Sequence, residues 1–188
     1  MNIVIFGPPG AGKGTQADFI VNKFDLHQLS TGQVLRNEIK NKTELGSKIS
    51  SIINSGSLVS DDIVKKLVEN FISDKKYKNR LIFDGYPRNL TQAKTLNELL
   101  SKYKQKVDLV LKLSVSLETI KKRILERQTL EKRADDNEET AIKRYKTYEK
   151  STEPVIEYYK KLNLLKVVDG ERSIDQINKE ISDIIRLI

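Results

Sequence analysis

The sequence has no cysteine among its 188 residues and a single histidine, His27. Disulfides and cysteine-based zinc sites are therefore excluded, and one imidazole cannot supply a cluster of histidine ligands. We do not expect His27 to be part of a Ser-His-Asp triad. We expect it to be a structural residue near the end of a strand. Because the lack of cysteine suits a reducing compartment, we expect the protein to be cytoplasmic.

Long apolar runs are also missing. No stretch of about 18 apolar residues could span a membrane, and the N-terminus has neither the basic start nor the cleavage site of a signal peptide. A hydrophobic content of 38% and a charged content of 32% are typical of a soluble globular protein. At 188 residues the chain is suited to one domain with small insertions.

Acidic residues are outnumbered, since the chain carries a formal net charge of +8 and has a pI of about 9.4. A basic protein binds nucleic acid, acidic membranes or small anions. Because there is no RNA-binding aromatic motif, zinc finger or basic tail, we expect small anions and neither nucleic acid nor membrane as partners. Against a lysine background, arginine indicates a site that requires a planar, bidentate phosphate fork. The arginines are Arg36, Arg80, Arg88, Arg123, Arg127, Arg133, Arg144, Arg172 and Arg186.

A glycine-rich loop directly follows the apolar run 2–6. Residues 7–17 read Gly-Pro-Pro-Gly-Ala-Gly-Lys-Gly-Thr-Gln-Ala. The spacing from Gly7 to Lys13 matches a phosphate-binding loop between a strand and a helix, where backbone N–H groups and the helix N-terminus face the anion. The generic motif has serine or threonine directly after the lysine to ligate Mg²⁺, but here Gly14 precedes Thr15. We therefore expect phosphates and water to hold most of the metal.

Apolar runs and helical periods alternate along the rest of the chain. The predicted strands are residues 2–6, 27–29, 81–84, 108–113 and 164–168. Between them, apolar residues recur every three or four positions, as in a helix that buries one face. This alternation predicts an α/β fold with a parallel sheet covered on both faces. Ligands then bind beyond the carboxyl ends of the strands, where the glycine-rich loop lies.

Residues 30–59 interrupt the alternation. Two helical stretches, 31–42 and 44–54, precede a helix that begins near Ser60, and Gly56 is placed to end the second stretch. We expect a small helical insertion that forms a moving second substrate site.

Charged residues gather at the predicted strand ends. Asp84 closes an apolar strand and places a carboxylate beside the position expected for Mg²⁺. The turn 85–88 that follows would direct Arg88 across the site. Earlier in the chain, residues 30–32 open a helix that carries Arg36, and a helix start is again suited to an anion.

Further arginines lie in the second half of the chain. Arg123 and Arg127 are four residues apart and share one helix face. Residues 133–140 are typical of a mobile connection followed by a helix start, with Arg133 at the beginning and Arg144 in the helix. Arranged around a phosphate loop, these arginines predict a site for a second phosphate-bearing partner.

These motifs resemble the adenylate kinase family of nucleoside monophosphate kinases over nearly the whole chain. The matching segments are residues 7–17, 29–36, 83–88 with Gln92, and 133–140. The resemblance implies a P-loop three-layer α/β/α fold with a five-stranded parallel sheet, and reversible phosphoryl transfer from Mg·ATP to AMP to give two ADP. It also implies a monomer with one kinase domain, 1–188. Within that domain it implies a core (1–29, 60–127 and 135–188), an NMP-binding segment (30–59) and a short lid (128–134).

The resemblance further implies which residues bind each nucleotide. The implied ATP residues are Gly10, Ala11, Gly12, Lys13, Gly14, Thr15, Arg123, Arg127 and Arg172. The implied AMP residues are Thr31, Arg36, Ser57, Leu58, Val59, Gly85, Tyr86, Pro87, Arg88, Gln92, Arg133 and Arg144. The implied catalytic residues are Lys13, Asp84, Arg88, Arg127, Arg133 and Arg144. Mg²⁺ would enter with ATP and take no direct protein ligand, with Asp84 binding it through water.

The lid is where the chain departs from the family. Many bacterial members carry a longer insertion here, often with zinc ligands. This chain has only residues 128–132 between Arg127 and Arg133, so no zinc is implied. The short form of the lid usually contains glycines. Because none is present here and Leu130 is apolar, we expect a stiffer or more helical connection.

Two alternative functions stay open at this point. A UMP/CMP kinase shares the short lid and most of the arginines. Thr31 favours AMP because the pyrimidine-specific relatives usually have alanine there, and the amide of Gln92 can pair with an adenine edge. More remotely, a nucleic-acid-dependent P-loop ATPase would require a further basic surface and a water-activating glutamate after Asp84, where Gly85 stands.

Overall fold

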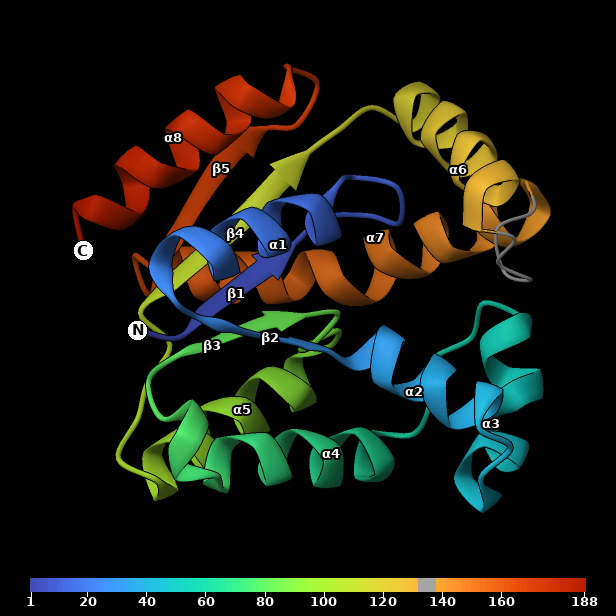
Figure 1. Ribbon diagram of the computed structural model, residues 1–188, viewed down its shortest axis with the longest axis horizontal. Coiled ribbons are helices and arrows are strands. Elements are labelled where there is room, and N and C mark those ends of the chain that lie inside the picture. Colours follow the sequence, from blue (N-terminus) through green and yellow to red (C-terminus); the bar gives the residue numbers. More distant parts are fainter. Residues whose placement is uncertain (132–137) are drawn as a thin grey trace.

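The computed structural model describes residues 1–131 and 138–188 and contains a five-stranded sheet (Figure 1). The strands are β1 (Ile3–Phe6), β2 (His27–Ser30), β3 (Leu81–Asp84), β4 (Leu109–Ser114) and β5 (Leu165–Asp169). The helices are α1 (Lys13–Phe24), α2 (Thr31–Lys40), α3 (Glu44–Asn54), α4 (Asp61–Ser73), the 3-10 helix η1 (Lys75–Tyr77), α5 (Leu90–Lys102), α6 (Leu117–Glu131), α7 (Glu138–Lys161) and α8 (Ile174–Arg186). Within the described ranges, no helix combines the length and apolar character needed to cross a membrane.

All five strands are parallel, in the order β2-β3-β1-β4-β5, which confirms the predicted sheet. Val4 in the central strand pairs with Phe83 of β3 and Val110 of β4. All three side chains are fully buried, which explains why these strands are nearly continuous apolar runs. At the carboxyl ends, Ile5 of β1 pairs with Asp84 of β3, so the loop after β1 lies beside that carboxylate.

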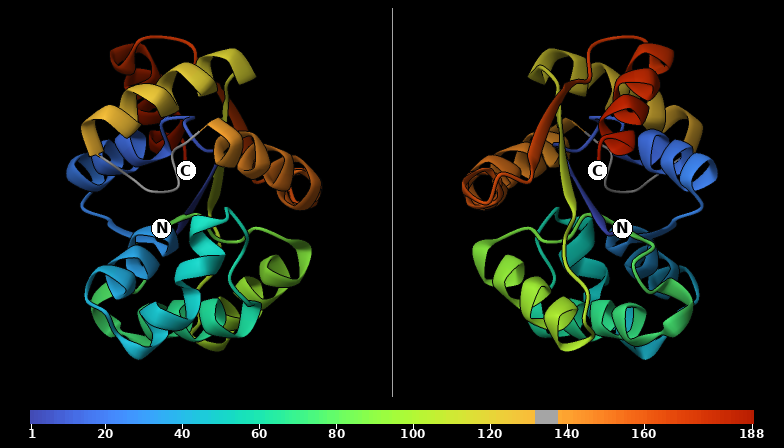
Figure 2. Two further views of the ribbon diagram at one scale, coloured as in Figure 1. Left: turned by 90° about the vertical axis from the view of Figure 1, so that its right-hand side faces the viewer. Right: turned by 90° about the vertical axis from the view of Figure 1, so that its left-hand side faces the viewer.

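Helices cover both faces of the sheet, which confirms the three-layer α/β/α arrangement. Figure 2 shows α1 and α7 on opposite sides of the sheet. α1 and α8 pack on one face through residues such as Ala17, Ile20, Ile177 and Ile181. α4, α5 and α7 pack on the other face through residues such as Val68, Ile72, Leu96, Val155 and Tyr159. α6 instead packs beyond the strand ends, where Ile120 and Ile124 meet Ala141 of α7.

The helical insertion is present as α2 and α3, which lie beyond the carboxyl end of β2 (Figure 1). The first helix ends before residue 42, because Lys42 takes a left-handed φ of 51°. The hydroxyl of Thr43 then accepts a hydrogen bond from the N–H of Gly46 at 2.9 Å and caps α3. Leu35 and Ile49 bury the inner faces of the two helices in the core that α4 shares.

α6 continues to Glu131, so residues 128–131 of the expected lid are helical. The sequence 117–131 contains neither glycine nor proline, which explains why the helix does not stop at Arg127. Arg133 and the rest of the expected lid lie outside the described residues. The division into core, NMP-binding segment and lid therefore stays a prediction.

The close approach of α2 and α3 depends on Gly46. A Cβ added to Gly46 would lie 2.1 Å from the carbonyl oxygen of Glu38, so any side chain must push the two helices apart. We predict that Gly46→Ala lowers the free energy of unfolding by about 2 kcal/mol or more. For a chain of this size the melting temperature should fall by about 4 °C or more in a thermal melt followed by circular dichroism.

Gly14→Ala is the matched control for this change. Gly14 is also helical, but a Cβ there would meet nothing within 4 Å. Alanine is the better helix former, so the control should melt at the same temperature as the original chain or higher. Equal melting temperatures for the two variants would show that α2 and α3 do not require the glycine.

Candidate active site

The carboxyl end of the sheet opens into a cleft with a volume of about 630 Å³. This volume lies within the range of small-molecule sites. The walls come from the loop after β1, from α1, β2 and α2, from β3 and the turn that follows it, and from α6 and α7. The predicted site residues on these walls are Gly10, Gly12, Lys13, Gly14, Thr15, Arg36, Asp84, Gly85, Arg88, Arg123, Arg127 and Arg144.

The loop between β1 and α1 has the geometry of an anion cradle. Gly10 and Gly12 have φ angles of 84° and 90°, which side-chain-bearing residues rarely adopt. A Cβ on Gly10 would lie 3.1 Å from Ile124 and 3.2 Å from the carbonyl oxygen of Ile120, so α6 packs directly on the loop. Because α1 begins at Lys13 and its first turn lines the cleft, the positive end of this helix faces any bound anion.

The ammonium group of Lys13 turns back over its own loop. Nζ donates hydrogen bonds to the carbonyl oxygens of Gly7 at 2.7 Å and Pro8 at 3.1 Å. Burial lowers the pKa of Lys13 from 10.5 to about 8, while Asp84 opposes this shift and the neighbouring arginines, Arg88 foremost, add to it. A polyphosphate would reverse the shift, because a nearby anion favours the charged ammonium.

Asp84 presents one carboxylate to the cleft. It is almost buried, and Oδ2 accepts a hydrogen bond from Nε2 of Gln28 at 3.1 Å. Thr15 lines the same cleft. Across the described part of the chain, no three residues of the types Asp, Glu, His and Cys gather in a possible metal site. One carboxylate and one hydroxyl fit a Mg²⁺ ion that keeps phosphate and water ligands, and do not fit a cage made only of protein groups.

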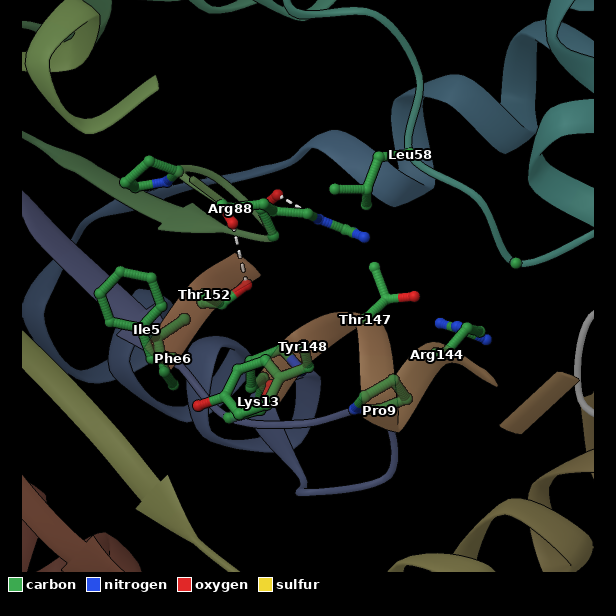
Figure 3. Close-up of a pocket in the computed structure, with 14 residues that line it drawn as sticks. Ile5, Phe6, Pro9, Lys13, Leu58, Arg88, Arg144, Thr147, Tyr148 and Thr152 are labelled. Carbon is green, nitrogen blue, oxygen red and sulfur yellow. Dashed lines mark hydrogen bonds between the residues drawn. The ribbon is translucent and has the colours of Figure 1, made fainter. Parts of the chain in front are cut away.

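Arg88 is held firmly by the turn after β3. Its Nε donates to the carbonyl oxygen of Gly85 at 2.7 Å, and its backbone N–H donates to Oε1 of Gln92 at 2.7 Å. Its carbonyl oxygen accepts a hydrogen bond from the hydroxyl of Thr152 in α7 at 3.1 Å. Figure 3 shows Arg88 and Arg144 on the wall of one small pocket, reaching in from this turn and from α7 respectively. Two guanidinium groups therefore converge from different elements.

A second pocket adjoins the cleft on the side of α2 and α3. The predicted AMP residues on its walls are Thr31, Arg36, Ser57, Leu58, Val59, Gly85, Arg88, Gln92 and Arg144. Leu35, Ile53 and Val64 add apolar surface. Because Arg36, Arg88 and Arg144 line both the cleft and this pocket, an anion in either cavity would meet the same guanidinium groups.

The remaining predicted site residues lie elsewhere. Ala11 and Tyr86 are buried, at 2% and 1% exposure, and support the loop and the turn. Pro87 lines the small pocket of Figure 3, and it is not among the described residues that line the cleft or the second pocket. Arg172 is not on the cleft wall, because its guanidinium pairs with carboxylates at the end of β5 and in α8. Arg133 lies outside the described residues.

The loop after β5 is tied to α6 by contacts that the sequence did not reveal. Nη2 of Arg123 donates to the carbonyl oxygen of Gly170 at 2.9 Å. The carboxylate of Glu171 accepts hydrogen bonds from the N–H of Ser116 at 2.6 Å and the hydroxyl of Thr119 at 2.7 Å. These bonds hold the pKa of Glu171 below its usual value, the backbone hydrogen bond foremost. Arg123 also lies close to the phosphate loop, since a Cβ added to Gly12 would be 4.0 Å from its Nη1.

Gln28 is a further site residue that was missed. Gln28 and Ser30 are two residues apart in β2, and both line the cleft. Two polar residues at a spacing of two in a strand were the available signal, because such residues share one side of the sheet. For Glu171 the sequence carries no comparable signal.

Comparisons with known proteins agree with this geometry. A family model described as adenylate kinase matches residues 5–164. The adenylate kinase of Pelagibacter ubique (strain HTCC1062) is 44% identical, and the alignment covers 100% of both chains. The adenylate kinase of Prochlorococcus marinus (strain MIT 9301) is 44% identical over 96% of both chains, and that of Fusobacterium nucleatum subsp. nucleatum is 39% identical over 98% of both chains.

The lengths of these alignments differ. The Pelagibacter ubique alignment spans 213 positions against the 188 residues of this chain, whereas the Prochlorococcus marinus alignment spans 181. The Pelagibacter ubique relative is thus longer within the aligned region, while the Prochlorococcus marinus relative matches this chain without such an excess. A match to most of the chain and relatives of this identity, together with the phosphate loop and the arginine-lined cleft, show that the chain belongs to the adenylate kinase family.

Proposed function

We propose that the chain catalyses reversible transfer of the terminal phosphoryl group of Mg·ATP to AMP, which gives two ADP. The observation that carries this proposal is the pair of adjoining cavities that share Arg36, Arg88 and Arg144. One cavity contains the phosphate loop, and the other has an apolar wall suited to a base. Two nucleotides placed with their phosphates toward the shared arginines would meet end to end.

On the ATP side, the loop from Gly10 to Thr15 would bind the phosphates through its backbone N–H groups, with Lys13 at the β- and γ-phosphates. Arg123 and Arg127 line the same cleft and would contact the adenine and the phosphates respectively. Arg172 would approach the adenine only after leaving its carboxylate partners.

On the AMP side, Arg36 and Arg88 would bind the phosphate, and residues 57–59 would line the nucleoside. Thr31 anchors this pocket, since its hydroxyl donates to the carbonyl oxygen of Gly85 at 3.0 Å. Gln92 would face the adenine edge.

The chemistry requires positioning and charge stabilisation more than proton transfer. The attacking phosphate oxygen of AMP is already an anion, so no general base is needed. Arg88, Arg127 and Arg144 would stabilise the negative charge on the transferring group, and Arg133 is assigned to the same task from the sequence resemblance. Because water competes with AMP as the acceptor, we propose that residues 30–59 and 128–134 close over the bound nucleotides.

Mg²⁺ would enter with ATP and neutralise charge on the β- and γ-phosphates. Asp84 would bind it through water, with Gln28 fixing the orientation of the carboxylate. We propose no zinc, because the sequence has no cysteine. A monomeric state and a cytoplasmic location stay predictions from the family and the composition.

The most direct test is a comparison of kcat/KM for AMP, UMP, CMP and GMP with ATP as donor. We predict that AMP is preferred by about 100-fold or more, because polar groups built for one base edge reject another strongly. A preference for UMP or CMP would overturn the AMP assignment and leave the reaction class intact. ATP consumption that requires RNA and no monophosphate would overturn the reaction class, although the relatives do not favour this alternative.

Removal of Arg88 tests the shared arginines. Arg88→Ala should lower kcat for AMP phosphorylation by about 10³-fold, by analogy with arginine fingers, with an unchanged melting temperature. Arg80→Ala is the control, because Arg80 precedes β3 at the opposite end of the strand and pairs with Asp25. The control should retain activity to within about twofold. A drop in kcat of less than about tenfold for Arg88→Ala would contradict the proposed charge stabilisation.

A further inference from the structure

The amide of Gln92 is held at both ends. Only 4% of the residue is exposed. Its Oε1 accepts a hydrogen bond from the backbone N–H of Arg88 at 2.7 Å, and its Nε2 donates to Oδ1 of Asp61 at 2.7 Å. The side chain nevertheless lines the second pocket, beside Thr31 and Leu58.

The two partners of this amide have opposite hydrogen-bonding character. An ionised carboxylate only accepts, and a backbone N–H only donates. Rotating the amide of Gln92 by 180° would set its oxygen against the carboxylate of Asp61 and its NH₂ group against the N–H of Arg88. Both hydrogen bonds would be lost, and the one to the carboxylate is the stronger because it is charge-assisted. The chemistry of the partners therefore defines one orientation for this amide.

Asp61 is itself fixed in place. It is the first residue of α4, and its two carboxylate oxygens accept from Nδ2 of Asn89 at 3.2 and 3.3 Å. Asn89 in turn caps α5, where its Oδ1 accepts from the N–H of Gln92 at 2.8 Å. The carboxylate of Asp61 is thus hydrogen-bonded to two residues at the start of α5, Asn89 and Gln92.

A fixed amide distinguishes bases that a rotating amide cannot. Each end of the Gln92 amide can form one more hydrogen bond: Nε2 has a second N–H, and Oε1 has a second lone pair. Adenine presents a donor at its 6-amino group next to ring-nitrogen acceptors, whereas a 6-oxo purine presents an acceptor at the same place. A freely rotating glutamine could match either pattern by exchanging its two ends, and a fixed one can match only one of them.

We propose that Asp61 is a positioning residue that sets the base specificity of the second nucleotide site, because it fixes the amide of Gln92 in the orientation for a 6-amino purine. This proposal rests on the proposed function, in which Gln92 faces the base of AMP. Asp61 is not among the residues that line the second pocket, so it would act through Gln92.

The test compares AMP with inosine monophosphate, which differs in the donor and acceptor pattern at position 6 and ring position 1. We measure kcat/KM for both substrates with the original chain and with Asp61→Asn, whose amide can donate as well as accept. The original chain should strongly prefer AMP. In Asp61→Asn the ratio of AMP to inosine monophosphate should fall by about tenfold or more, because one of the two restraints on Gln92 is gone. The KM for ATP should not change.

Asp62→Asn is the matched control, since Asp62 is the next residue of α4, has the same charge and is exposed. It should leave the ratio unchanged. The double variant Asp61→Asn with Gln92→Leu should have the same ratio as Gln92→Leu alone, because Asp61 acts only through Gln92. Should Asp61→Asn melt at a much lower temperature, Asp61→Ser provides a smaller side chain that can also donate and accept, and the same fall in ratio is expected.

Equal losses for both substrates in Asp61→Asn and Asp61→Ser would overturn the proposal, because a merely structural role affects both alike. An original chain that does not distinguish the two purines would also overturn it. These outcomes differ from failure of the proposed function, in which the original chain would not phosphorylate AMP at all.

Discussion

Positive charge concentrated at the carboxyl end of one sheet is the constraint on which the rest of the site depends. Lys13 lies among arginines from the β3 turn, α6 and α7, and burial together with these charges lowers its pKa to about 8. The arginines disfavour the ammonium of Lys13 and Asp84 favours it, while burial is the largest cause of the lowered pKa. A polyphosphate bound in this cleft would bring negative charge beside Lys13 and favour its ammonium form.

The fold makes this concentration possible. Parallel strands end at one edge, so a loop after β1 and a turn after β3 lie together although their residues are far apart in sequence. α6 packs on the loop at Gly10, and α7 reaches the turn through Thr152. The insertion of α2 and α3 adds the second pocket without interrupting the sheet. The arginines of the cleft therefore come from several elements: α2, the turn after β3, α6 and α7.

Much of this arrangement could be predicted from the sequence, because it depends on local patterns. Apolar runs located all five strands, and the phosphate loop and arginine spacing indicated Lys13, Arg88 and Arg144 at one cleft. The first insertion helix was predicted too long, because a left-handed residue at position 42 was not evident. The contact between Asp61 and Gln92 could not be predicted, since it joins two helix starts whose packing is set by the whole core.

The central claim, that a bound polyphosphate restores the positive charge of Lys13, is tested most directly by proton uptake. With its pKa lowered to about 8, Lys13 should be partly deprotonated at pH 8 in the free protein, and a bound anion should raise its pKa and restore the proton. Calorimetric titration with Mg·ATP at pH 8, in two buffers of different ionisation enthalpy, should reveal uptake of about half a proton. The uptake should fade toward pH 6 and vanish in Lys13→Arg, whose guanidinium stays charged. Binding of Mg·ATP at pH 8 with no proton uptake, or with equal uptake in Lys13→Arg, would contradict the claim.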